Sequence, residues 1–152
     1  MLLTTVAVLG LTSGARKVWP RGGRLWMRVY ALALVFLVLL PESPWEGPAP
    51  NETVASLHTV AGASGAVAFI LGVAAISASR IGAPLAIRTY DWLVIAALAV
   101  IPQLMLLAVE YDGLLQRLMV SLGYVWLVAE STRVIRRVRA PSPRHAVESE
   151  RT

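Results

Sequence analysis

Residues 54–79 carry the sequence VASLHTVAGASGAVAFILGVAAISAS, which contains no charged side chain and lies between Glu52 and Arg80. At a rise of ~1.5 Å per residue, a helix over this stretch is about 39 Å long, which exceeds the ~30 Å thickness of bilayer hydrocarbon. A helix satisfies its own backbone hydrogen bonds, as lipid requires, and the stretch lacks the alternation typical of a strand. The stretch therefore predicts a transmembrane helix.

Further apolar stretches flank this one and extend the prediction to the whole chain. They cover about residues 1–15, 25–40, 92–109 and 114–135. Of the 152 residues, 57% are hydrophobic and 15% are charged, whereas soluble domains carry about 25% charged residues. We predict an all-α integral membrane bundle of five transmembrane helices in a single domain at residues 1–138, followed by a disordered basic tail at residues 139–152.

The basic residues are unevenly distributed among the connections between these stretches. All except Arg117 fall in or next to the first and third connections and the C-terminal end, while the second and fourth connections carry only acidic charges. The positive-inside rule assigns the basic side to the cytoplasm. Because the abundance of Arg, Ala, Val and Leu is typical of bacterial proteins, we expect a multi-pass protein of the inner (plasma) membrane, with its N-terminus outside and its C-terminus in the cytoplasm.

The first apolar stretch, residues 1–15, is short for a membrane span. A signal peptide is disfavoured, because its basic residues precede the apolar core, whereas Arg16 and Lys17 follow it here. An N-terminus outside the membrane is unusual for a first helix that has no basic residue before it. Two expectations follow. The stretch is either a short first span, or the second helix of a six-helix fold whose first helix precedes Met1.

Polar side chains gather near the predicted outer end of the bundle. His58 lies near the start of its stretch, and Arg117 lies about one turn into the last one, where a charge is costly unless it pairs or faces a wet cavity. The candidate ligand-binding cluster comprises Glu42, His58, Glu110, Asp112, Gln116 and Arg117. The alternatives for His58 are a hydrogen bond that fixes helix packing, a ligand contact and metal ligation. Those for Arg117 are a structural ion pair and the binding of an anionic group.

Small residues form a stripe in the helix predicted at residues 54–79. Ala61, Gly65, Ala68 and Gly72 follow one another at intervals of four, three and four residues, which places them on one helical face. Such stripes allow helix backbones to approach closely in lipid. The stripe therefore predicts helix packing, either within this bundle or against another membrane protein.

Signatures of catalysis are lacking in the sequence. The chain has no cysteine and no phosphate-binding glycine loop, and a single histidine, His58, lies in the predicted membrane region. Catalytic zinc sites need three protein ligands, and no ligand pair here has helical spacing. We therefore expect no catalytic residues, no metal and no cofactor, and enzyme activity is disfavoured.

Binding is the leading functional hypothesis. We expect the protein to hold a lipid or small amphipathic molecule at the outer end of the bundle; the alternative is a structural or accessory subunit that packs on another membrane protein or on a second copy. A metal-dependent membrane hydrolase and a transporter are less favoured. The basic cytoplasmic side is expected to contact anionic lipid headgroups. Nucleic acid is not an expected partner, because the tail lacks interleaved aromatic residues.

The motif SLHT at residues 56–59, the motif GLLQR at residues 113–117 and Trp126 occur in an order and spacing that resembles a family of bacterial multi-pass membrane proteins, domain of unknown function 998. The resemblance covers essentially the whole chain, from the family's second helix onward. It implies a six-helix fold that lacks its first helix and the following polar loop, so a site that needs this loop would be incomplete. Since the family has no settled activity, the resemblance implies fold and membrane location only.

Overall fold

The computed structural model describes residues 2–40, 51–80 and 82–139, and the regular elements of these residues are all helical. The α-helices are α1 (Leu2–Gly14), α2 (Arg21–Leu39), α3 (Glu52–Ala78), α4 (Leu85–Leu107) and α5 (Asp112–Arg139). Two short 3-10 turns, η1 (Ala15–Lys17) and η2 (Val109–Tyr111), precede α2 and α5. The all-α prediction is confirmed.

The helices α2 to α5 are each long and apolar enough to cross a membrane. Many of their large hydrophobic side chains are exposed, among them Leu93, Leu106 and Val128. Such a surface suits lipid, because a soluble monomer rarely exposes apolar patches of this extent. Helix α1 has 13 residues, or about 20 Å at the α-helical rise. Within the described residues, four helices are therefore long and apolar enough to span a membrane. The remaining one of the five predicted spans corresponds to the shorter α1.

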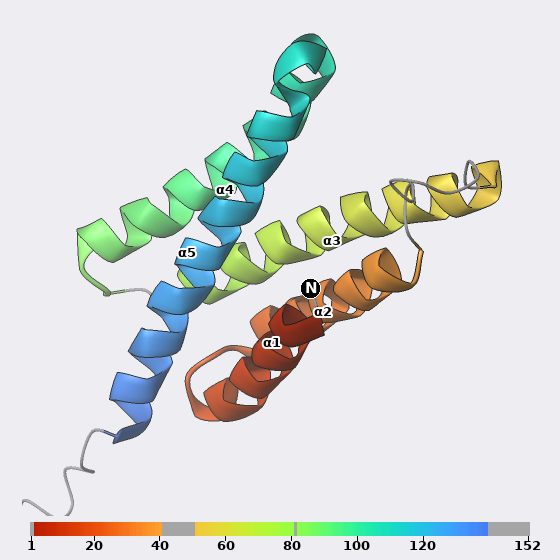
Figure 1. The fold of residues 1–152 in the computed structure, drawn as a ribbon. Helices are drawn as coiled ribbons and strands as arrows, with labels where there is room; N and C mark the ends of the chain where they lie inside the picture. The colour runs from red at the N-terminus through yellow and green to blue at the C-terminus, as the bar shows by residue number, and fades with distance from the viewer. Residues whose placement is uncertain (1, 41–50, 81, 140–152) are drawn as a thin grey trace, which may run out of the picture.

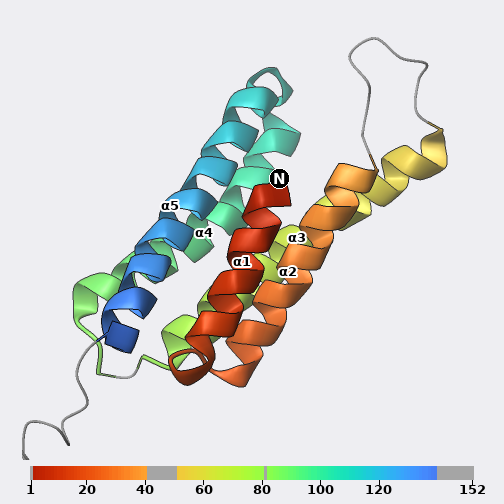
Figure 2. The same ribbon diagram turned by 60° about the horizontal axis from the view of Figure 1, so that its bottom comes forward.

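The long helices form two antiparallel hairpins, α2–α3 and α4–α5, and α1 packs against α2 (Figure 1). The hairpins approach each other where α3 ends and α4 begins, and they diverge toward the opposite end of the molecule, so that the bundle has the shape of a V. Figure 2 shows that the α1–α2 connection, the α3–α4 connection and the C-terminal end of α5 lie together at one end. We call this the basic end, because these segments carry Arg16, Lys17, Arg80, Arg136 and Arg137. The opposite end is the far end.

Local sequence explains where the helices begin and end. The side chain of Asn51 accepts a hydrogen bond from the backbone N–H of Thr53 at 3.1 Å and so caps the start of α3. Helix α4 begins directly after Pro84, whose fixed φ suits a helix start. Pro102 lies inside α4, and the helix continues past it to Leu107, as proline-containing membrane helices commonly do.

The small-residue stripe of α3 faces α2. All four residues of the stripe are buried. A Cβ atom built on Gly65 would lie 3.1 Å from the Cβ of Ala33, and one on Gly72 would lie 2.9 Å from the terminal methyl group of Met27. The two backbones therefore approach too closely for larger side chains. This face of α3 is covered within the chain itself.

Aromatic side chains join the two hairpins near the middle of the molecule. The ring of Phe69 on α3 packs edge-on against Tyr30 of α2, with the centroids 4.9 Å apart, and against Trp126 of α5, at 5.5 Å. The rings of Trp126 and Trp19 are 6.4 Å apart. Edge-to-face pairs of this kind add stabilisation beyond the area that they bury. These aromatic contacts therefore connect α2 and α3 to α5 near the middle of the molecule.

Candidate functional site

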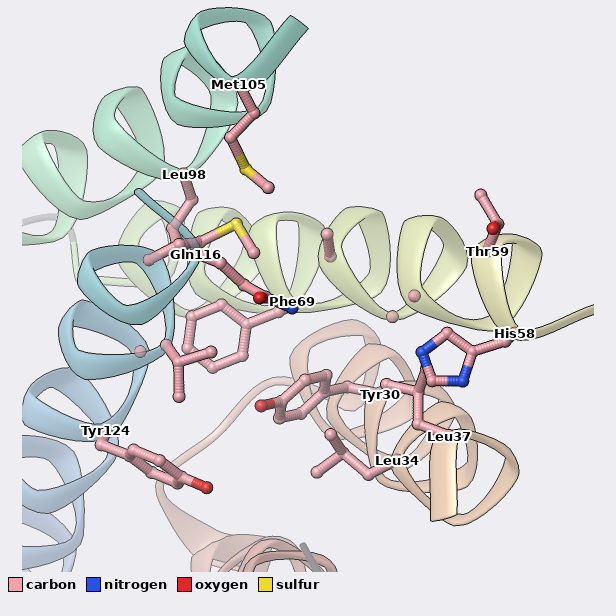
Figure 3. A pocket seen from close by; sticks show the side chains of 16 residues that line it. Tyr30, Leu34, Leu37, His58, Thr59, Phe69, Leu98, Met105, Gln116 and Tyr124 are labelled. Carbon is pink, nitrogen blue, oxygen red and sulfur yellow. The ribbon is translucent and has the colours of Figure 1, made fainter. Parts of the chain in front are cut away.

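A cavity of about 370 Å³ lies between the two hairpins, on the side where they diverge (Figure 3). Its walls come from α2, α3, α4 and α5 and are largely apolar, with Leu34, Phe69, Leu98 and Met105 among the lining side chains. Ligand sites in proteins usually measure about 300–1,000 Å³ and combine apolar walls with a few polar groups. The cavity therefore has the size of a small-molecule site.

Small residues help to create this space. Gly62, Ala66 and Gly123 line the cavity from α3 and α5. A Cβ atom built on Gly123 would lie 3.9 Å from the nearest atom of Phe69, which is an ordinary van der Waals contact. The position of Gly123 therefore accepts a Cβ atom, and because Gly123 lines the cavity, a longer side chain there would reduce the space inside it.

Uncharged polar groups line the same cavity. The hydroxyl groups of Tyr30 on α2 and Tyr124 on α5 point toward one another (Figure 3). The hydroxyl of Tyr124 is hydrogen-bonded to the side chain of Thr4 in α1, at 3.0 Å. Within the described part of the chain, the Tyr30 hydroxyl and the Gln116 amide form no hydrogen bond to the protein. These two groups are therefore available to a molecule in the cavity.

His58 also lines the cavity, near the start of α3. Its ring nitrogen Nδ1 is hydrogen-bonded to the backbone carbonyl of Leu40, which follows α2. Because a carbonyl only accepts, Nδ1 carries the proton in this bond. His58 thus ties the start of α3 to the end of α2, in addition to facing the cavity.

The structure brings together only part of the cluster predicted from the sequence. His58 and Gln116 line one cavity. Glu110 in η2 and Arg117 in α5 are exposed and do not line it, and Arg117 forms no ion pair with the residues that the structure describes. Glu42, the side chain of Asp112 and the predicted tail from residue 140 onward lie outside the described residues.

A second polar site lies near the basic end and involves residues that the sequence analysis did not single out. The side chains of Asp91 on α4 and Glu130 on α5 are fully buried, with 0% exposure. Arg80, which follows α3, is 7% exposed and donates from one guanidinium nitrogen to Asp91, at 2.8 Å, and from the other to Glu130. Arg133 lies 3.6 Å from Asp91 and 3.3 Å from Glu130. We call these four residues the charge cluster.

Two tryptophans complete the charge cluster. The indole N–H of Trp126 donates to Asp91 at 2.9 Å, and that of Trp19 donates to Glu130 at 2.8 Å. The two cations balance the two carboxylates, and every carboxylate oxygen has at least one partner. Buried charges persist only when they are paired and hydrogen-bonded in this way. The charge cluster therefore holds together α4, α5, the residue that follows α3 and the α1–α2 connection.

A signal of the charge cluster is present in the sequence. Apart from the C-terminal tail, the segments predicted to lie on the cytoplasmic side carry mostly arginines. Asp91 and Glu130 are the acidic residues in or next to these segments. A carboxylate among arginines next to an apolar stretch suggests a buried pair. The partners, however, come from separate helices, and only the tertiary structure identifies them.

The described residues contain no group of three His, Cys, Asp or Glu side chains placed to hold a metal ion. The two sites therefore differ in character. The cavity offers apolar contact and uncharged hydrogen-bonding groups, whereas the charge cluster is internally paired. Of these two sites, the cavity is the one that offers space and hydrogen-bonding groups to another molecule.

Comparison with known proteins assigns the chain to a family. Neither the curated proteins nor the solved structures contain a match to this sequence. The family model described as "Protein of unknown function (DUF998)" matches residues 1–133, which include α1 to α4 and most of α5. The resemblance inferred from the sequence motifs is thereby confirmed. The chain belongs to the DUF998 family.

Proposed function

We propose that this membrane protein holds a single-chain lipid or another small amphipathic molecule in the cavity between its two hairpins. The observation that carries the proposal is the cavity itself, which is about 370 Å³ in volume and has apolar walls from four helices. At ~30 Å³ for a group of the size of a water molecule, this volume holds about twelve such groups. The headgroup and the first part of one hydrocarbon chain fill this space, and in this proposal the rest of a longer chain extends out of the cavity into the bilayer.

The polar groups give such a site its selectivity. A molecule that enters from the bilayer already has apolar surroundings, so burying its chain in protein gains little from the hydrophobic effect. Close packing and hydrogen bonds must then distinguish the bound molecule from bulk lipid. Tyr30 and Gln116 supply hydrogen-bonding groups inside the cavity that the hydrocarbon of a bilayer does not offer.

The position of the cavity supports a site in the outer half of the bundle. Leu37 near the end of α2, Met105 near the end of α4 and Gln116 near the start of α5 all line the cavity and belong to the far end of their helices. We assign the basic end to the cytoplasmic side by the positive-inside rule. In this proposal the protein lies in a bacterial inner membrane with its N-terminus outside, and the cavity belongs to the outer leaflet.

The test compares the wild-type protein with two glycine variants by native mass spectrometry after mild extraction from the membrane. Gly123→Leu places a side chain in the cavity, next to Phe69. Gly10→Leu is the matched control, because a Cβ atom on Gly10 meets nothing within 4 Å and Gly10 does not line the cavity. We expect a lipid-mass adduct on the wild type and on Gly10→Leu, and its loss from Gly123→Leu.

Thermal melting of the three proteins accompanies this test, so that a loss of the adduct is read only from a folded Gly123→Leu variant. An adduct that persists in folded Gly123→Leu would overturn the proposal. So would a wild-type protein that carries no adduct. A wild-type chain that is bare of lipid but bound to another polypeptide would favour the accessory-subunit alternative.

A further inference from the structure

We propose that the molecule in the cavity is a neutral single-chain lipid with a hydroxyl-bearing headgroup, of the class of monoacylglycerols and long-chain alcohols, and that Tyr30 and Gln116 hold its hydroxyl. This inference rests on the proposed function and specifies its ligand. It is argued from the charge of the cavity lining and from the hydrogen-bonding capacity of two side chains.

The described lining of the cavity carries no acidic side chain, lysine or arginine, which favours a neutral ligand. Among the described residues, no Asp, Glu, Lys or Arg side chain lines the cavity. Arg117, the neighbour of Gln116 in the sequence, is exposed and lies outside the lining. A phosphate or carboxylate in apolar surroundings without a counter-charge is strongly disfavoured. The lining therefore selects against anionic lipids, although these are the lipids that we expect the basic end to attract.

Two polar groups of the cavity are available for hydrogen bonds to a ligand. The Tyr30 hydroxyl and the Gln116 amide have no partner among the described residues, and each can both donate and accept a hydrogen bond. A ligand hydroxyl has the same two capacities, so it can accept from one group and donate to the other. An ester or ether oxygen can only accept. The two free groups are therefore best satisfied by a hydroxyl.

The two available groups lie on opposite hairpins of the bundle. Tyr30 belongs to α2 and Gln116 to α5, so they come from different hairpins (Figure 3). The other three polar side chains of the lining already have partners, since His58 bonds to the Leu40 carbonyl, Thr59 donates to the Ala55 carbonyl and Tyr124 bonds to Thr4. A hydroxyl bound by both free groups connects the two hairpins across the cavity. The bound headgroup would thus bridge α2 and α5 on the side where the two hairpins diverge.

Three probes with the same oleoyl chain separate these arguments. Monooleoylglycerol is neutral and carries hydroxyls, methyl oleate is neutral but only accepts hydrogen bonds, and oleoyl lysophosphatidylglycerol carries hydroxyls and a negative charge. Native mass spectrometry of the full chain in a neutral detergent gives the Kd of each probe. We expect monooleoylglycerol to bind at least tenfold more tightly than either of the other two.

Side-chain variants assign the hydroxyl to its partners. Tyr30→Phe and Gln116→Met each remove one hydrogen bond at nearly constant volume, which corresponds to a loss of about three- to tenfold in affinity for monooleoylglycerol. Neither change should alter the affinity for methyl oleate. Tyr111→Phe is the matched control, because Tyr111 is exposed and lies outside the cavity; it should leave all three affinities unchanged.

The outcomes distinguish this inference from the proposed function. If oleoyl lysophosphatidylglycerol binds as tightly as monooleoylglycerol and folded Gly123→Leu loses both, the cavity site stands and the neutral headgroup is wrong. If Tyr30→Phe and Gln116→Met both retain the full affinity for monooleoylglycerol, the assignment of the hydroxyl is wrong. If no probe distinguishes the wild type from folded Gly123→Leu, the proposed function itself is wrong.

Discussion

Replacing Arg80 with leucine removes the cation that joins Asp91 of α4 to Glu130 of α5. In the native protein, each terminal nitrogen of the guanidinium donates to one of these two carboxylates. After the substitution, Arg133 is the remaining cation of the charge cluster, at 3.6 Å from Asp91 and 3.3 Å from Glu130. Two buried carboxylates then share one partly exposed arginine, and the charge cluster carries a net charge of −1.

The expected loss of stability is large. Removing one partner of a buried ion pair costs about 3–5 kcal/mol, because the other partner stays buried without compensation. The indole N–H groups of Trp126 and Trp19 still donate to Asp91 and Glu130, so the carboxylates keep one neutral donor each. For a chain of this size, ~1 kcal/mol corresponds to a Tm shift of about 2–4 °C, and we expect Arg80→Leu to lower the Tm by roughly 10 °C.

Thermal unfolding in detergent, followed by circular dichroism, measures this difference. Arg88→Leu is the control, since Arg88 is exposed in α4 and the change deletes one basic charge from the same end of the chain; its expected effect is within about 0.5 kcal/mol. The double variant Arg80→Leu/Asp91→Leu restores neutrality, so its loss should be smaller than the sum of the single losses by about 1–3 kcal/mol. If Arg80→Leu and Arg88→Leu melt at the same temperature, the buried-pair argument is refuted.

Two further predictions concern α3. Gly72→Leu forces a side chain against Met27, whose terminal methyl group would lie 2.9 Å from the new Cβ, and should cost about 1–3 kcal/mol by overpacking; Gly10→Leu, with open space around it, is expected to melt like the wild type, and equal melting of the two variants would contradict the close approach of α2 and α3. Asn51→Ala removes the cap that accepts from the Thr53 N–H, which should cost about 1 kcal/mol and speed amide exchange in the first turn of α3, whereas unchanged exchange there would show that the cap does not hold the turn.

The hydropathy of the sequence was enough to locate the helices, because long apolar stretches in a chain of this composition have few alternatives to a membrane-spanning helix. The boundaries deviate where charges enter a helix. The sequence predicted a span from residue 92, yet α4 begins at Leu85. Its first turns carry Arg88 and Asp91, which lower the hydropathy, but the charge of Asp91 is neutralised by Arg80. At the other end of the chain, α5 extends to Arg139 instead of 135, where basic side chains interact favourably with the helix C-terminus.

The candidate site was predictable only in part. His58 and Gln116 were singled out as polar residues near one end of the bundle, and the structure places both around one cavity. The contribution of Tyr30 was not predicted, because a tyrosine within an apolar helix gives no sign of whether its hydroxyl faces a cavity. The exposed position of Arg117 was likewise not predictable. Helical spacing shows which residues share a face, but it does not show whether that face contacts another helix.

The V shape makes the width of the cavity sensitive to small rotations. Helix α4 has 23 residues and is therefore about 35 Å long, and the charge cluster holds it near the basic end through Asp91. With the charge cluster as the fulcrum, the lever runs from Asp91 to Leu107 and is about 24 Å long. A tilt of about 5° then displaces the far end of α4 by about 2 Å, which is more than the rise of one helical residue. Changes in bilayer thickness or lateral pressure that tilt one hairpin against the other would thus widen or narrow the cavity while the charge cluster stays intact.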